Sequence, residues 1–284
     1  MQLADYVGYH ERLGKKVVWL DGVPFSEYRR RFLWSLPRFR EYDIERSHLR
    51  RLLGRDALGV IAMSSAASDR RAAFCVAGGE YGFERLQSRT RSKTRRGLAA
   101  CEIREVAWDE MLEAGLEINR EALRRQQRPS FLGEADWWSR QCEISAQFPA
   151  VRAWGAYVGG ELAAYVHVIM HAAAPDAPGG PVADIVHFMS ANGHLKSYPN
   201  EALIFTVVGS LLQAGCEYVV LGSGSDDEQL LSWKRHMGFT IQASSYDLVV
   251  NPLMHLVKPF VPKLRIWMDG SVLGAAPDGR ATAV

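Results

Sequence analysis

The alternation of apolar and polar residues becomes regular after residue 101 and predicts one mixed α/β domain. Residues 102–106 alternate between polar and apolar side chains, which is typical of a half-buried strand. Apolar positions three and four residues apart then predict helices over residues 108–127 and 134–147, the second stopped by Pro149. The first strand is therefore followed by two helices.

Strands dominate the next part of the pattern. Residues 151–158 and 161–171 read as two strands joined by the turn Gly159–Gly160, which makes them antiparallel neighbours. After a Pro- and Gly-rich loop, residues 182–190 read as a third strand, which we expect to pair antiparallel with the second.

The remaining pattern alternates helices and strands: a helix at 200–214, a strand at 218–221, a helix at 226–237 and a strand at 239–250. Asn200 is the expected N-cap of the first of these helices, and Gly215 ends it. The order β-α-α-β-β-β-α-β-α-β predicts an α/β (α+β) fold with a central, mixed, mostly antiparallel sheet flanked by helices.

The N-terminal residues are less regular. Apolar runs predict strands at 17–20, 57–63 and 72–77. Ser26 is placed to cap a helix towards Trp34 that Pro37 interrupts, and a second helix is expected at 43–53.

A basic helix is expected at residues 83–101. Its cations share one face at spacings of four, four and three residues: Arg85, Arg89, Lys93 and Arg96. Arg91 and Arg95 extend the charge around the helix. Arg89, Lys93, Arg95 and Arg96 are the candidates for holding the phosphates of CoA, tRNA or a nucleotide-linked acceptor. A merely solvated face is the alternative.

Composition narrows the class of protein. The 284 residues carry a formal net charge of +2 and are 48% hydrophobic, which is ordinary for a globular protein. The four cysteines show no CxxC spacing, so we expect neither a zinc site nor a redox dithiol. Four cysteines in a chain of this length do not make a disulfide framework, so we expect a cytoplasmic location. No signal peptide is expected, and the most apolar stretch, residues 202–216, is too short to span a membrane.

Three stretches resemble the GNAT N-acyltransferases, and more closely their FemAB/FemX-like branch. The stretches are the basic residues 91–98, the helix-Gly-strand-Gly unit around residues 215–222, and the closing pattern Leu231-Ser-Trp-Lys234…Gly238-Phe239. The resemblance implies a GNAT-like domain at 101–250 and a C-terminal extension with a flexible tail at 251–284. Residues 1–100 then either form a second, degenerate GNAT-like unit or decorate the first.

One departure concerns the acyl donor. GNAT acetyltransferases usually carry a glycine loop whose N–H groups hold the pyrophosphate of acetyl-CoA. Residues 192–200 lack that pattern, and Pro199 removes an N–H donor there. The FemAB-like branch also lacks the loop, and the resemblance implies aminoacyl-tRNA or another large acyl donor acting on an amine.

Acyl transfer to an amine needs oxyanion stabilisation and a path for the amine proton. Lys234 lies on the apolar face of its helix beside Trp233 and matches the family pattern, so it is the candidate electrostatic stabiliser. The alternative is a lysine whose stem covers the core while its ammonium reaches solvent. His187 and His167, in near register on neighbouring strands, are the candidate bases, with half-buried structural histidines as the alternative.

Tyr198, Asn200, Trp233 and Tyr165 are the remaining candidates, for substrate binding. The predicted function is direct transfer of an acyl or aminoacyl group from an activated donor, acyl-CoA or aminoacyl-tRNA, to a small-molecule or peptide amine. No metal is expected, tRNA is a candidate partner, and the oligomeric state stays open. The alternatives are an ordinary acetyl-CoA-dependent enzyme and a non-catalytic GNAT-shaped protein that binds a nucleotide or RNA.

Overall fold

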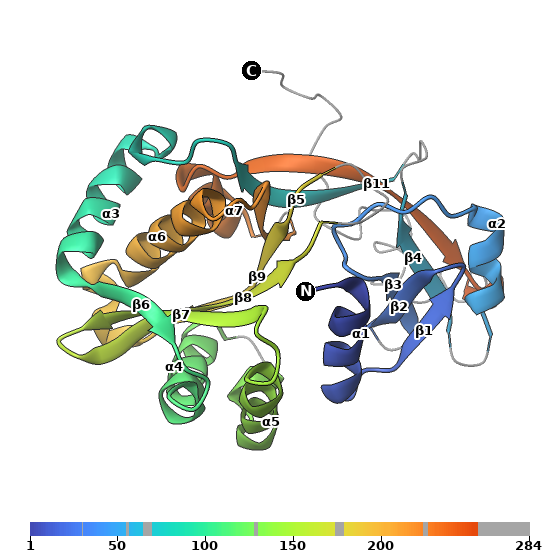
Figure 1. Cartoon of the computed structure of the whole chain (residues 1–284), viewed down its shortest axis with the longest axis horizontal. Helices are drawn as coiled ribbons and strands as arrows, with labels where there is room; N and C mark the ends of the chain where they lie inside the picture. The colour runs from blue at the N-terminus through green and yellow to red at the C-terminus, as the bar shows by residue number, and fades with distance from the viewer. Residues whose placement is uncertain are drawn as a thin grey trace. The chain divides into compact units, whose positions relative to one another are not determined.

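The computed structural model describes residues 1–29, 31–54, 57–64, 70–127, 130–173, 179–223 and 227–254. The chain divides into two compact units (Figure 1). Unit 1 contains Met1–Leu13, Val76–Gly222 and Ser232–Thr240; unit 2 contains Gly14–Cys75, Ser223–Leu231 and the residues from Ile241.

The sheet of unit 1 has the strand order β10-β9-β8-β7-β6. Its strands are β6 (Glu102–Val106), β7 (Val151–Val158), β8 (Glu161–His171), β9 (Val182–Ser190) and β10 (Tyr218–Ser223). Neighbours from β6 to β9 are antiparallel, and β9 pairs parallel with β10. The turn between β7 and β8 has positive φ at Gly159 and Gly160, as predicted for a tight hairpin.

Helices cover both faces of this sheet. They are α1 (Leu3–Arg12), α3 (Ser88–Ala100), α4 (Met111–Arg125), α5 (Ala135–Ser145) and α6 (Pro199–Gln213), and α7 (Glu228–His236) enters the unit at Ser232. Figure 1 shows α4 and α5 on one face and α6, with α3 against it, on the other. The core on the α5 face centres on Trp138, which is fully buried and donates from Nε1 to the Met111 carbonyl at 2.9 Å.

The element order predicted for residues 102–250 is confirmed, including its strand boundaries at 151–158, 161–171 and 182–190. The predicted basic helix is correct only in part. The short 3-10 helix η2 (Phe83–Arg85) is followed by extended backbone at Leu86 and Gln87, and α3 begins at Ser88, so Arg85 lies outside it. The predicted fold class, a mixed, mostly antiparallel sheet flanked by helices, is also confirmed.

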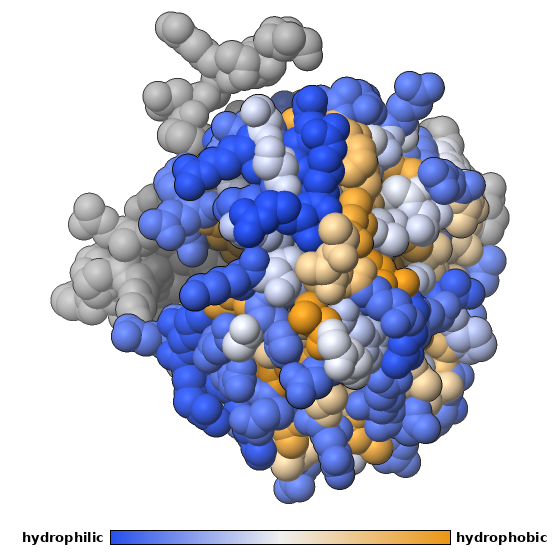
Figure 2. Space-filling model, turned by 90° about the vertical axis from the view of Figure 1, so that its left-hand side faces the viewer, coloured by the Kyte–Doolittle hydropathy of each residue, from blue (hydrophilic) through white to orange (hydrophobic). Residues whose placement is uncertain are grey.

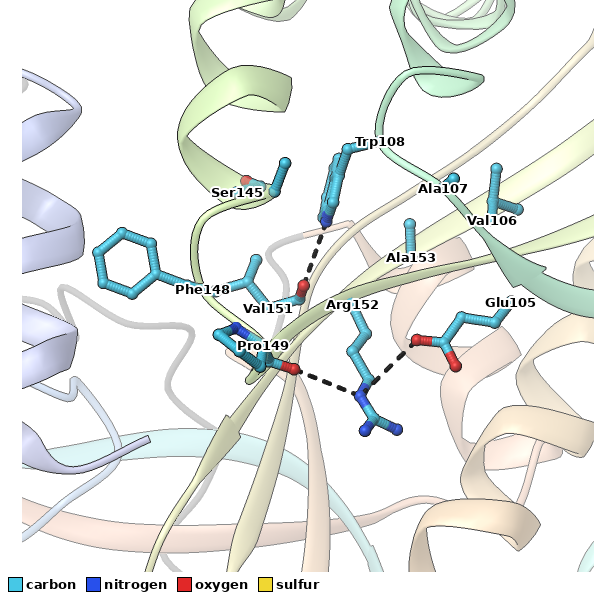
Figure 3. Close-up of a pocket in the computed structure, with 11 residues that line it drawn as sticks. Glu105, Val106, Ala107, Trp108, Ser145, Phe148, Pro149, Val151, Arg152 and Ala153 are labelled. Carbon is cyan, nitrogen blue, oxygen red and sulfur yellow. Dashed lines mark hydrogen bonds and ion pairs between the residues drawn. The ribbon is translucent and has the colours of Figure 1, made fainter.

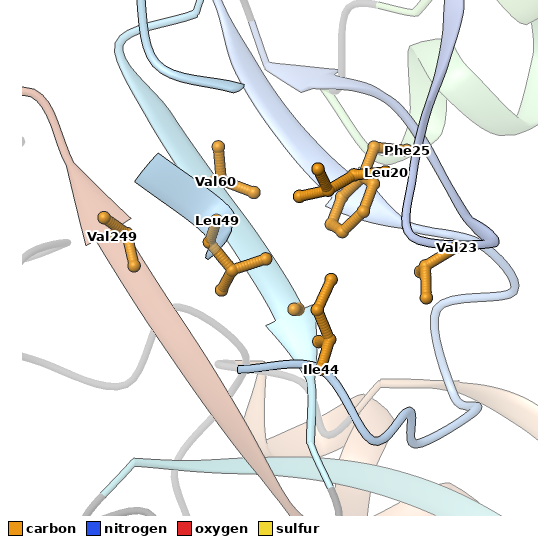
Figure 4. Close-up of a cluster of buried hydrophobic side chains, with 8 residues drawn as sticks. Leu20, Val23, Phe25, Ile44, Leu49, Val60 and Val249 are labelled. Carbon is orange, nitrogen blue, oxygen red and sulfur yellow. The ribbon is translucent and has the colours of Figure 1, made fainter. Parts of the chain in front are cut away.

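Unit 2 is built on strands in the order β1-β2-β3-β4-β11. These are β1 (Val17–Leu20), β2 (Val23–Arg29), β3 (Phe32–Ser35), β4 (Gly59–Met63) and β11 (Thr240–Val250), and β5 (Arg71–Gly78) carries the chain into unit 1. An apolar cluster covers one face of these strands (Figure 4): Leu20, Val23, Phe25, Ile44, Leu49, Val60, Ala62 and Val249.

The helix predicted to start at Ser26 is wrong. Val23–Arg29 and Phe32–Ser35 instead form the antiparallel pair β2 and β3, in which Ser26 lies opposite Trp34. Valine and aromatic residues favour strands, and Phe25 of β2 is buried in the apolar cluster.

The other N-terminal predictions hold in part. The helix expected at 43–53 shortens to α2 (Arg46–Leu49) and the 3-10 helix η1 (Arg50–Leu52), and α1 was not predicted. Much of the loop expected after β8 and almost all of the C-terminal extension lie outside the described residues. Within the described part of the chain, no helix has both the length and the apolar character needed to cross a membrane.

Candidate functional site

In unit 1, strands β9 and β10 stop pairing part-way along β9, and the place where their pairing ends is called the opening below. Among the described residues, these strands pair only where Tyr218–Val220 meets Val182–Asp184, although β9 continues to Ser190. The register between β8 and β9 also shifts, because His167 faces His187 while Val168 faces Ile185. Val186 is thus an extra residue in β9. Bulges of this kind often lie next to active sites, where they redirect side chains.

Helix α7 places two side chains at this opening. The Trp233 ring stacks on Phe188 of β9, with ring centroids 5.4 Å apart and planes 14° apart. Lys234 is only 5% exposed, and its Nζ donates to the Leu221 carbonyl at 2.7 Å. The ammonium is therefore held inside the protein beside β10 rather than extended into solvent.

Gly222 adds a local requirement beside Lys234. Its φ is 65°, a conformation that residues with a side chain rarely adopt. A Cβ at this position would lie 3.7 Å from Lys234 Nζ. A glycine here therefore lets β10 turn while its backbone stays close to the ammonium.

The two histidines predicted as bases do come together. His167 and His187 are direct register partners with ring centroids 5.6 Å apart, and the Trp108 ring contacts His167 edge-on at 5.0 Å. His167 is 1% exposed, and neither of its ring nitrogens has a hydrogen-bond partner within the described residues. Burial, and then the neighbouring His187, lower the pKa of His167 well below its usual value.

Because His167 stays neutral in the folded state, we expect it to make stability pH-dependent. Below about pH 6.5 the unfolded chain binds a proton at this residue that the native state does not bind, so stability falls as pH falls, by up to about 1.4 kcal/mol per pH unit. Urea unfolding of the wild type and of His167→Leu between pH 8 and pH 5 measures this. The variant should lose less stability on acidification, and equal slopes for the two proteins would contradict the prediction.

The histidine pair and Lys234 approach the sheet from different faces. Tyr165 and His167 share a face by alternation, and Tyr165 packs near Trp138 of α5. Phe188, next to His187 in β9, points to the other face, where Trp233 stacks on it. The residues predicted to be catalytic are therefore divided between the two sides of β9, with the histidine pair on one side and Lys234 on the other.

Tyr165 belongs to the interior. It is fully buried, and its hydroxyl donates to Asn119 Oδ1 of α4 at 2.5 Å. Burial is the main reason that the pKa of Tyr165 is strongly raised. The structure places this residue between the sheet and its covering helices.

Asn200 is not the helix cap that the sequence predicts. The N-cap of α6 is Tyr198, with φ 53°, and Pro199 occupies the first turn. Proline is well suited to the first helical position, so the N-cap lies two residues earlier than expected. The Asn200 side chain instead donates from Nδ2 to Ser190 Oγ at 3.0 Å.

Arg125, at the end of α4, is a residue that the sequence analysis missed. Its Nη1 and Nη2 each donate to the Ser190 carbonyl at 3.3 Å, and Nη1 also donates to Asn192 Oδ1. It therefore ties α4 to the end of β9 and to the loop before α6. Sequence spacing carries no signal for this contact, since the partners are far apart along the chain.

Cations from α3 surround the ring of Tyr198. Arg96 lies 4.8 Å from the ring centroid and donates from Nη1 to the Tyr198 hydroxyl at 3.3 Å, and Lys93 Nζ lies 5.6 Å from the centroid. Arg95 lies over Phe83 at 5.0 Å, and Arg89 is exposed. No acidic residue occurs in α3, and strongly hydrophilic side chains gather over this part of the surface in Figure 2.

The start of α6 is closely covered. A Cβ on Gly97 of α3 would lie 2.6 Å from the Tyr198 carbonyl oxygen, so the two helices meet at backbone distance. Glu201 places a carboxylate in the first turn of α6, 4.0 Å from Lys93. A helix N-terminus already complemented by an acid attracts a pyrophosphate less strongly.

A separate pocket of about 360 Å³ lies at the ends of β6 and β7 (Figure 3). Trp108 lines it and donates from Nε1 to the Val151 carbonyl at 3.2 Å. Arg152 Nε lies 3.7 Å from Glu105, and Figure 3 shows this pair pointing away from Trp108. The apolar wall and the charged pair thus belong to different sides of the strands.

In the part of the chain that the structure describes, no group of three or more His, Cys, Asp or Glu residues could hold a metal ion. The cysteines are free: Cys75, Cys101, Cys142 and Cys216.

Comparison with known proteins identifies the fold. No family model and no curated protein matches the sequence. FemX is similar in structure, with a TM-score of 0.63 and 10% identity over 90% of this chain and 94% of that chain. L-PGS from Bacillus licheniformis has a TM-score of 0.54 and 11% identity, over 93% and 96%.

A third similar structure, from Agrobacterium fabrum, is described as the C-terminal domain of a lysylphosphatidylglycerol synthetase. It has a TM-score of 0.59 and 11% identity, over 94% of this chain and 93% of that chain. At such identities the likeness is one of fold. The chain shares the fold of FemX and of these two structures, in line with the FemAB/FemX-like resemblance of the three sequence stretches.

Proposed function

We propose that this protein is an N-acyltransferase that moves an acyl or aminoacyl group from an activated ester or thioester directly to an amine. The observation that carries the proposal is the opening between β9 and β10, where the buried Lys234 ammonium lies beside the Leu221 carbonyl. The fold shared with FemX and with lysylphosphatidylglycerol synthetases supports transfer chemistry of this class.

The reaction follows from these groups. The acceptor nitrogen attacks the donor carbonyl carbon, and the tetrahedral oxyanion that forms is stabilised by the positive charge of Lys234. The C–O or C–S bond to the leaving group then breaks. The proton lost by the amine passes through water to the leaving oxygen or sulfur, because His187 lies on the other face of the sheet from Lys234, and no bond to the enzyme forms.

The donor is larger than acetyl-CoA in this proposal. Pro199 lacks an N–H group, and Glu201 already supplies negative charge to the first turn of α6. The cations of α3 instead offer a phosphate-binding surface next to that helix, which suits aminoacyl-tRNA or a long-chain acyl donor. The acceptor is a small-molecule or peptide amine.

The α3 cations should act on donor binding and not on the chemical step. Arg89→Ala and Arg96→Ala are expected to raise the KM for the donor severalfold with kcat little changed. Their donor affinity should also depend less steeply on salt. Arg235→Ala, an exposed cation on α7, is the matched control. An equal effect in all three variants would show general charge attraction and contradict a specific role for α3.

Ligand-dependent stabilisation tests the donor class. Thermal shifts are measured with acetyl-CoA, a long-chain acyl-CoA, and charged and uncharged tRNA, because a ligand that binds only the native state raises Tm. We expect a shift with a large donor. A shift with acetyl-CoA alone would favour an ordinary acetyltransferase.

A second candidate function rests on the charge of α3, whose charged residues are all cations. A protein that only binds RNA or a nucleotide would show donor-independent affinity with a steep salt dependence and no transfer to any amine. Transfer of a labelled acyl group to an amine excludes this candidate.

A further inference from the structure

Unit 2 carries a polar cluster on the face opposite the apolar cluster of Figure 4. Ser26 of β2 pairs with Val17 of β1 on one side and with Trp34 of β3 on the other. Directly paired residues share a face, and Phe25, the neighbour of Ser26, belongs to the apolar cluster. Ser26 and Trp34 therefore face away from that cluster.

Two cations join this face. The Arg38 guanidinium lies 4.7 Å from the Tyr28 ring centroid and 5.2 Å from that of Trp34, and the two rings meet edge-on. Lys15 precedes β1 by two residues and is close enough to Arg38 for the two charges to interact. Lys15, Ser26, Trp34 and Arg38 are called the Lys15 cluster below.

The cluster has positive charge without a counter-charge. Lys15 and Arg38 are both half-buried, and within the described residues neither forms an ion pair with a carboxylate. Burial, and then the charge of Arg38, lower the pKa of Lys15 to about 8. The lowered pKa shows that the charged form of Lys15 is disfavoured beside Arg38. A bound anion stabilises the charged forms of both side chains.

The cluster also has unused hydrogen-bonding groups. Trp34 is 2% exposed and Ser26 is 3% exposed, yet Trp34 Nε1 and Ser26 Oγ have no hydrogen-bond partner in the described part of the chain. Buried polar groups are normally paired, because each one left unpaired costs about 1–3 kcal/mol. An indole N–H can only donate, so its partner must be an acceptor.

We propose that the Lys15 cluster binds an anion of the phosphate class, a phosphate monoester or a diphosphate. A dianion balances the two cations and offers enough oxygens to accept from guanidinium, ammonium, hydroxyl and indole donors together. A guanidinium stacked on aromatic rings keeps its in-plane N–H groups for such an anion. A carboxylate carries a single charge and matches the cluster less well.

Solution NMR on the full chain tests the proposal at the cluster itself. The indole N–H signal of Trp34, identified by its loss in Trp34→Phe, is followed during titration with inorganic phosphate and pyrophosphate at constant ionic strength. We expect a saturable shift that chloride and acetate do not reproduce. Binding should also raise the pKa of Lys15, followed through its side-chain signals.

Matched variants give the specificity. Lys15→Met keeps the apolar stem and should weaken phosphate binding by about tenfold, while Lys16→Met, which removes an exposed neighbouring cation, should leave it unchanged. Arg38→Met should weaken phosphate binding in the same way as Lys15→Met. Because Arg38 packs on two rings, Arg38→Lys replaces this variant if Arg38→Met does not fold. An unshifted Trp34 signal, equal losses in Lys15→Met and Lys16→Met, or equally strong binding of acetate would each overturn the proposal.

Discussion

Replacing Lys234 with methionine is expected to lower kcat by about a hundredfold or more, the effect of removing one oxyanion-stabilising group. Lys234 is 5% exposed, and its ammonium donates to the Leu221 carbonyl at the end of the paired part of β10. In such a water-poor environment a fixed positive charge stabilises a developing oxyanion far more than it would in water. Methionine keeps most of the stem volume, so the packing of α7 survives better than with alanine.

The measurement compares kcat and unfolding free energy in the same preparations, once the donor has been identified by thermal shift. Arg235→Met is the control, because Arg235 directly follows Lys234 but is exposed and points away from the opening. A loss of stability with unchanged turnover would make Lys234 a tie between α7 and β10 and remove it from the reaction.

The position of Lys234 could be predicted because it depends on helix periodicity alone. Leu231, Lys234 and Met237 are all buried, at the spacing of three expected for one face of a helix. Local signals of another kind, the Gly159–Gly160 turn and the Pro- and Gly-rich loop after β8, explain why the strand boundaries of β7, β8 and β9 were predicted correctly.

The antiparallel pairing of β8 with β7 and β9 was predicted, but the places where strand pairing ends or slips were not. The opening between β9 and β10 and the extra residue Val186 arise from register, which a single strand sequence does not specify. Arg125 reaches Ser190 only because α4 crosses the end of β9. In unit 2, the Ser26 side chain is typical of a helix N-cap, but the burial of its neighbour Phe25 in the apolar cluster favours a strand.

The second large prediction concerns Gly97 and Gly209. Replacing each of these helical glycines with alanine should change the free energy of unfolding in opposite directions. At Gly97 a new Cβ would lie 2.6 Å from the Tyr198 carbonyl oxygen and 2.9 Å from the Cβ of Ala202. The first of these atoms is backbone, so α3 must move, and Gly97→Ala should destabilise unit 1 by about 1–3 kcal/mol. At Gly209 nothing lies within 4 Å, so Gly209→Ala should stabilise α6 by about 0.5–1 kcal/mol.

Denaturant midpoints at unchanged m-values measure both changes. The two variants also separate stability from donor binding, since moving α3 takes Lys93 and Arg96 away from Tyr198 while Gly209→Ala leaves them in place. Gly97→Ala should therefore raise the donor KM even at temperatures where the protein is fully folded. If it stabilises the protein as Gly209→Ala does, α3 does not approach α6 at backbone distance, and the phosphate-binding surface proposed for α3 loses its geometric basis.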